Sequence, residues 1–152
     1  MLSSVHSSDN SAFMPQAMKS VRIVQWAMLL CIVLYAALSV VIRPSVRALD
    51  PTVSYIFTML GVASVGAIFV VRRTLVFRAA ATLGTQPGDT LSLNHWKTGY
   101  LMTYALCEML ALFGLIERFL GANIPQSVPY YIGGFVLMLF FRPQTPEAAP
   151  SS

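Results

Sequence analysis

Four apolar blocks, separated by short polar segments, constrain this chain more than any other feature. They lie at about 23–42, 53–71, 98–120 and 125–141. An apolar helix of about 20 residues crosses a hydrocarbon core about 30 Å thick. Only 11% of the residues are charged, against about 25% in an ordinary soluble domain. The pattern therefore predicts an all-α fold, a four-helix transmembrane bundle.

The polar segments complete a single membrane domain. We expect residues 19–142 to form this domain, with a connection at 72–97 between the second and third spans. Within the connection, 74–83 contains good helix formers, and it either continues the second helix beyond the membrane or lies along the membrane surface. The two ends, 1–18 and 143–152, are polar and rich in Ser, Pro and Ala, which predicts disorder.

Basic residues at the ends of the blocks predict the orientation, because cytoplasmic flanks carry the excess of Lys and Arg. Seven basic residues fall on the side of the N-terminus and three on the other side. Both termini and the 72–97 connection are therefore expected in the cytoplasm, as in a multi-pass protein of the bacterial cytoplasmic membrane. The same clustering, without interleaved aromatics, excludes a nucleic-acid partner despite the net charge of +4. The seven are Lys19, Arg22, Arg72, Arg73, Arg78, Lys97 and Arg142, and the three are Arg43, Arg47 and Arg118.

One acidic residue lies deep inside the third block. Glu108 is 11 residues past Lys97, which is about 16 Å along a helix and hence near the middle of the bilayer. At this depth the other blocks carry no Lys, Arg or His, so no counter-charge is expected. An ionised carboxylate in hydrocarbon is costly, and we expect Glu108 to keep its proton and donate a hydrogen bond.

The groups available to Glu108 define a candidate intramembrane polar site. Glu108, Tyr104, Tyr131 and Ser64 are its predicted members, and Thr103 is a further candidate partner. Residues at i, i+3, i+4 and i+7 share one side of a helix. We expect a polar or small stripe of the third span to face the bundle: Tyr100, Tyr104, Cys107, Glu108, Ala111 and Gly114. The opposite side, facing lipid or other helices, contains Met102, Met109, Leu112, Phe113 and Ile116.

Charged and ionisable residues at the ends of the third block receive simpler interpretations. Glu117, beside Arg118, is expected to be a solvated end charge, and His95, beside Trp96, an interfacial residue.

Cys31 and Cys107 are isolated in apolar surroundings, which indicates buried small hydrophobes. No metal site and no cofactor are therefore expected.

Glycines within the blocks predict helix contacts, because small residues let membrane helices approach closely. The predicted packing positions are Gly61, Gly66, Gly114, Gly133 and Gly134.

Residues 105–115, ALCEMLALFGL, resemble the proton-carrying helix of rotary ATPase proteolipid (c) subunits, which has a mid-membrane acid followed by a small residue, an aromatic and a glycine. This resemblance implies that Glu108 is an ion-binding carboxylate. Over its whole length the chain resembles small four-span integral membrane proteins of bacteria, a resemblance that implies no particular activity.

Two functional hypotheses follow from these observations. The first is a small polytopic membrane protein of structural, accessory or assembly type, surrounded by the lipid bilayer and associating with a second copy or another membrane protein. The second is a proton- or cation-coupled transporter or channel subunit that uses Glu108. An enzyme is not expected, because the sequence contains no catalytic motif.

Overall fold

A computed structural model describes residues 6–41, 49–86 and 89–144, with side chains described from residue 15 onward. These residues are almost entirely helical and contain no strand, which confirms the all-α bundle. The elements are α1 (His6–Val41), α2 (Pro51–Val71), the π-helical segment η1 (Arg72–Phe77), α3 (Arg78–Thr85), α4 (Thr90–Phe119) and α5 (Ile124–Phe140).

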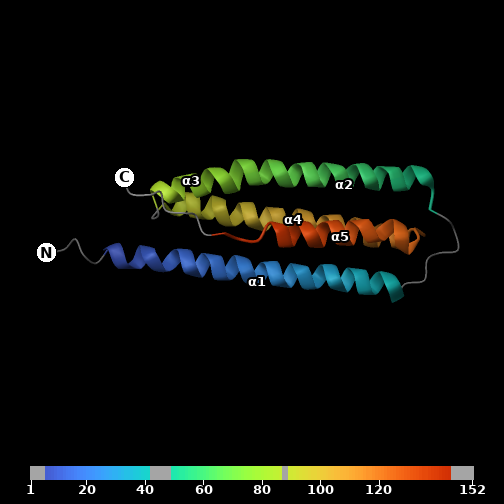
Figure 1. The fold of residues 1–152 in the computed structure, drawn as a ribbon, viewed down its shortest axis with the longest axis horizontal. Helices are drawn as coiled ribbons and strands as arrows, with labels where there is room; N and C mark the ends of the chain where they lie inside the picture. The colour runs from blue at the N-terminus through green and yellow to red at the C-terminus, as the bar shows by residue number, and fades with distance from the viewer. Residues whose placement is uncertain (1–5, 42–48, 87–88, 145–152) are drawn as a thin grey trace.

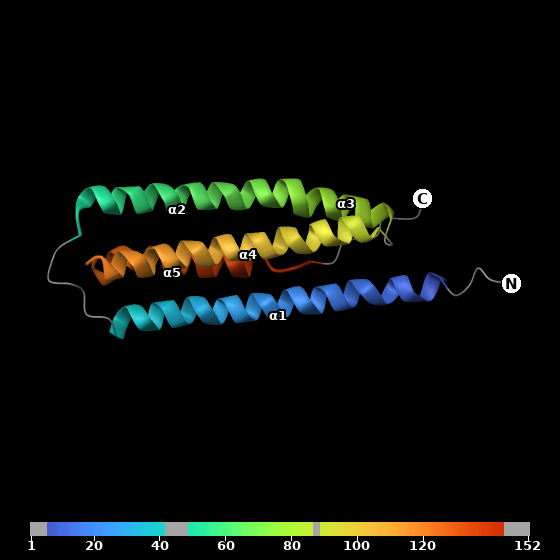
Figure 2. The same cartoon turned by 180° about the vertical axis from the view of Figure 1, so that it is seen from behind.

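The four long helices lie side by side, and α4 is the central one. α1 and α4 run in one direction, while α2 and α5 run in the other (Figures 1 and 2). α1, α2 and α5 each pack against α4. Half of the most apolar stretch of α4 is buried, against 22% for α1 and 17% for α2. The core therefore follows α4, and α1 and α2 expose most of their apolar surface.

Three helices are long and apolar enough to cross a membrane: Pro15–Val41, Pro51–Thr85 and Thr90–Phe119. α5 has only 17 residues, about 25 Å of helix, which is near the lower limit for a span. The fourth crossing therefore stays a prediction.

Two element boundaries differ from the simplest expectation. α1 begins at His6, so residues 6–18, predicted to be disordered, continue the helix of the first block. Residues 1–5, and residues 145–152 of the tail predicted to be disordered, lie outside the described part. The apolar block nucleates the helix, and Ala, Met and Gln favour its extension, whereas Pro15 inside α1 removes one backbone hydrogen bond. The other boundary is the end of α2. Here η1 and α3 follow without a break, so residues 74–83 continue the second helix and do not form a separate segment on the membrane surface.

Polar residues at the helix ends define the turns. Asp50 caps α2 by accepting a 2.8 Å hydrogen bond from the Thr52 amide, and Pro51 occupies the first helical position. The chain leaves α4 through Gly121, whose φ of 108° lies in the left-handed region that favours glycine. Asn123 then caps the start of α5, and its backbone amide donates to Gln126 Oε1 at 3.0 Å. The short turn keeps α5 beside α4.

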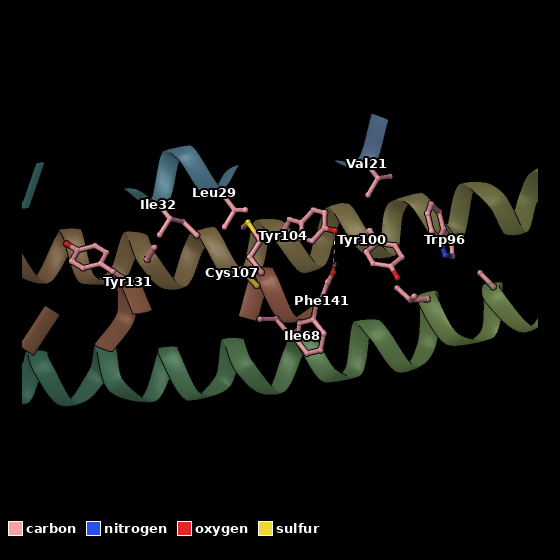
Figure 3. Packing of buried hydrophobic residues seen from close by; sticks show 14 of the residues in the cluster. Val21, Leu29, Ile32, Ile68, Trp96, Tyr100, Tyr104, Cys107, Tyr131 and Phe141 are labelled. Atoms are coloured by element: carbon pink, nitrogen blue, oxygen red, sulfur yellow. Dashed lines mark hydrogen bonds between the residues drawn. The ribbon is translucent and has the colours of Figure 1, made fainter. Parts of the chain in front are cut away.

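The C-terminal end of α5 lies between α1 and α4. Gln25 Nε2 donates to the Met138 carbonyl at 2.9 Å. The Tyr104 hydroxyl donates to the Phe141 carbonyl at 3.3 Å (Figure 3). The Arg72 guanidinium lies 4.2 Å from the centre of the Phe141 ring. The last carbonyls of a helix lack partners within the helix, and hydrocarbon supplies none. These side chains therefore allow a short helix to end inside the bundle.

Candidate functional site

Glu108 lies in the middle of α4, where it contacts α1. The Tyr35 hydroxyl donates a hydrogen bond of 2.8 Å to Glu108 Oε1, and both side chains are partly buried. Within the described ranges Glu108 forms no ion pair. Two polar groups that hydrocarbon cannot solvate thus satisfy each other across a helix contact.

None of the partners predicted for Glu108 bonds to it. Tyr104 donates to a carbonyl at the end of α5. The Thr103 and Ser64 hydroxyls each donate, at 2.8 Å, to the carbonyl four residues earlier in their own helices, as such hydroxyls commonly do. The Tyr131 hydroxyl is buried and has no hydrogen-bond partner in the part of the chain that the structure describes. The predicted polar site is therefore dispersed.

The predicted stripe on the third span does face the bundle. Trp96, Tyr100, Tyr104 and Cys107 follow one another along α4, and the Trp96 and Tyr100 rings are 4.8 Å apart (Figure 3). Of the residues expected on the opposite side, three are exposed and two are partly buried. The buried stripe residues are Tyr100, Tyr104, Cys107, Ala111 and Gly114; the exposed residues are Met102, Met109 and Ile116, and the partly buried ones are Leu112 and Phe113.

Glycine positions mark the closest helix approach. A Cβ added at Gly134 would lie 2.5 Å from the Cys107 carbonyl oxygen, so α5 and α4 are in backbone contact there. Gly66 requires a correction: nothing lies within 4 Å of its added Cβ, because it faces away from α4. A Cβ added at any of the other predicted positions would lie 2.9–3.3 Å from the nearest atom of a neighbouring helix. These positions are Gly61, Gly114 and Gly133.

Glu117 is the second carboxylate of α4, and its predicted role as a solvated end charge is wrong. Only 1% of its surface is exposed. Its Oε1 accepts hydrogen bonds from the Ser54 hydroxyl of α2 and the Tyr130 hydroxyl of α5, each at 3.4 Å. Thr58 lies 3.3 Å from the same Tyr130 oxygen. Hydroxyls from two helices therefore contact this acid, and a third hydroxyl, that of Thr58, reaches it only through Tyr130.

Arg118 is buried as well, but it faces α1. Its Nε donates to the Ser39 carbonyl at 2.9 Å and its Nη1 to the Ala122 carbonyl at 2.8 Å. Successive residues of a helix point about 100° apart, which explains how Glu117 and Arg118 reach different neighbours. Arg118 stabilises a carbonyl in the last turn of α1 and one in the turn that follows α4, near the negative ends of both helix dipoles.

A groove of about 640 Å³ lies between α2 and α5, and Glu117 forms part of its wall. Its other lining is mostly apolar, with Val62, Val65 and Leu137 among the residues. The groove exists because α2 and α5 each pack against α4 more than against each other. It places a carboxyl group and hydroxyls beside an apolar space open to the surroundings.

Metal-binding groups are not gathered in the described ranges: no cluster of three His, Cys, Asp or Glu occurs there. Cys31 and Cys107 are free thiols, the first partly buried and the second buried. Comparison with models of protein families, with curated proteins and with solved structures finds no match. The resemblance of 105–115 to the proteolipid helix therefore stays a prediction.

Sequence reasoning missed Tyr35 and Glu117 as members of the polar sites. Tyr35 lies 13 residues past Arg22, and Glu108 lies 11 residues past Lys97, so the two have similar expected depths in the membrane. This similar depth was the available signal for Tyr35. For Glu117 no comparable signal exists, because its partners come from two other helices.

Proposed function

We propose that this chain is a multi-pass membrane protein of structural, accessory or assembly type, without catalytic activity, oriented with both termini in the cytoplasm. The 2.8 Å hydrogen bond between Tyr35 and Glu108 carries the proposal. It gives the mid-membrane acid a role in holding α1 against α4. One such bond between membrane helices contributes about 0.6–2 kcal/mol.

The surface of α2 supports an assembly role. α2 packs against α4 but not along α1, and large apolar side chains such as Tyr55, Val62 and Val70 are more than 60% exposed. In lipid these side chains need no cover, yet they offer a wide face to a second copy or another membrane protein. A partner at this face would leave the α1–α4 contact undisturbed.

A double-mutant cycle tests the structural role of Glu108. Tyr35→Phe removes the donor and Glu108→Leu removes the acceptor, whereas Glu108→Gln retains an acceptor oxygen. We expect the first two substitutions each to lower the free energy of unfolding in detergent by about 0.6–2 kcal/mol, and the combination to cost no more than Glu108→Leu alone. Glu108→Gln should stay close to wild type. Additive losses would contradict the proposed bond.

Transport is the second candidate function, and the buried Glu117 favours it. A proton- or cation-coupled subunit needs a carboxylate beside a path for the ion. Glu117 lines the groove between α2 and α5 together with Ser54 and Tyr130, whose hydroxyls contact it, whereas Glu108 does not line this groove. In this alternative Glu117, rather than Glu108, exchanges the ion.

Proteoliposomes distinguish the two functions. The structural role predicts that the wild-type chain carries no proton flux above that of empty vesicles under an imposed gradient. A flux lost in Glu117→Gln but retained in Glu108→Gln would establish the transport alternative. A flux lost in Glu108→Gln, with folding intact, would contradict the purely structural role of that residue.

A further inference from the structure

A groove of about 900 Å³ lies between α1 and the C-terminal end of α5. It exists because α5 ends at Phe140 while α1 continues past it toward its own N-terminal end (Figure 1). The segment after α5 forms one wall through Arg142, Pro143 and Gln144. The groove is thus a place where the bundle lacks its fourth helix.

Two arginines give this groove its charge. Arg22 on α1 and Arg142 after α5 both line it, and both side chains are exposed. Neither forms an ion pair with another described residue. Each also adjoins the end of an apolar block, so the two guanidinium groups lie at the level where a membrane span meets the headgroups.

The remaining lining is apolar and aromatic. Leu29 and Leu139 continue the groove toward the middle of the bundle, and Trp26, which is 66% exposed, lies beside the arginines. Tryptophan favours the headgroup level of a bilayer, and guanidinium groups bind phosphate oxygens in pairs. Cationic at one end and apolar at the other, the groove matches the two parts of a phospholipid.

We infer that this groove binds one anionic phospholipid, with its phosphate held by Arg22 and Arg142 and an acyl chain along Leu29 and Leu139. Basic pockets between membrane helices on the cytoplasmic side recognise anionic headgroups in this way. The lipid would replace the missing last turns of α5 in covering α1. This site is independent of whether the chain has a structural role or transports an ion.

Thermal unfolding of the purified full-length chain in a neutral detergent tests the inference. Phosphatidylglycerol, phosphatidylcholine and inorganic phosphate are added separately to wild type, to the Arg22→Gln/Arg142→Gln double variant and to Arg73→Gln. Arg73 is exposed near the same end but does not line the groove, so this variant controls for the loss of a basic side chain outside the site. We expect phosphatidylglycerol to stabilise wild type and Arg73→Gln, with an apparent affinity on the order of tenfold weaker in the double variant.

Three results would overturn the inference. Equal stabilisation of the double variant and Arg73→Gln by phosphatidylglycerol would show that the arginines are not the site. Equal stabilisation of wild type by phosphatidylcholine, or by inorganic phosphate, would show that no anionic lipid is selected. Should the double variant fail to fold, native mass spectrometry of wild type decides: one retained phosphatidylglycerol in competition with phosphatidylcholine supports the site, and none overturns it.

Discussion

Gly134→Ala should loosen the contact between α4 and α5. The added Cβ would lie 2.5 Å from the Cys107 carbonyl oxygen and 3.5 Å from the Ala111 Cβ. A carbon–oxygen contact normally needs about 3.3 Å, so the helices must separate by about 0.8 Å. The obstacle is backbone rather than a flexible side chain. Overpacking of this kind costs about 1–3 kcal/mol, and we expect about 2 kcal/mol here.

Reversible unfolding of the detergent-solubilised chain by dodecyl sulfate, followed by helix circular dichroism, measures this loss. Gly66→Ala is the control, because it makes the same change within a membrane helix where nothing lies within 4 Å. The control should match or slightly exceed wild type, since alanine is the better helix former. If the free energies of unfolding of the two variants agree within about 0.5 kcal/mol, a typical error for independent sites, the backbone contact does not exist.

Two further predictions concern a helix start and a helix end. Asp89 caps α4, and the hydrogen bond from the Ser92 hydroxyl, helped by the Leu91 amide, lowers the pKa of Asp89 below its usual value. A lowered folded-state pKa contributes stability above the unfolded pKa of about 3.9 that is lost as the pH falls through the folded value. The stability difference between wild type and Asp89→Ala should therefore shrink from pH 7 to pH 3, and a constant difference would contradict the ionised cap. Gln25→Leu should lower the free energy of unfolding by about 1 kcal/mol, because the Met138 carbonyl loses its donor; an unchanged midpoint of unfolding would contradict this.

The fold class was predictable because the apolar blocks are long enough for helices that span a bilayer. Long apolar blocks have few alternatives to spanning helices, since every backbone group needs a partner within its own segment. The buried face of α4 was also predictable, because its small and polar residues recur at helical spacing. The weak fourth block did become the shortest of the four long helices, α5, with 17 residues.

The polar sites were less predictable, because depth is readable from sequence but direction around the helix is not. Counting from the flanks brings Tyr35 near the level of Glu108, yet nothing in the sequence says that α1 rather than α5 covers that side of α4. Glu117 was placed at a helix end, where exposure is usual. Its burial depends on Ser54 and Tyr130, which only the packing brings together.

The glycines of α2 also show that direction around a helix cannot be read from the sequence. Both Gly61 and Gly66 lie in an apolar block, but only Gly61 faces the other helices, where Leu110 of α4 and Tyr130 of α5 lie within 3.4 Å of its added Cβ. In a membrane the outward face is as apolar as the inward one, so hydrophobic periodicity does not separate them.

Collision accessibility of spin labels tests most directly whether lipid surrounds this bundle. Single cysteines at Leu30, Val62 and Ile132 lie near the middles of the apolar blocks in α1, α2 and α5, where the native side chains are 60%, 65% and 57% exposed. A label at exposed Asn94 is the reference. In bilayers, all three central labels should collide readily with oxygen and rarely with a water-soluble nickel chelate, the reverse of Asn94. Ready collision of the three with the nickel chelate would contradict the account, because water rather than hydrocarbon would then cover these helices.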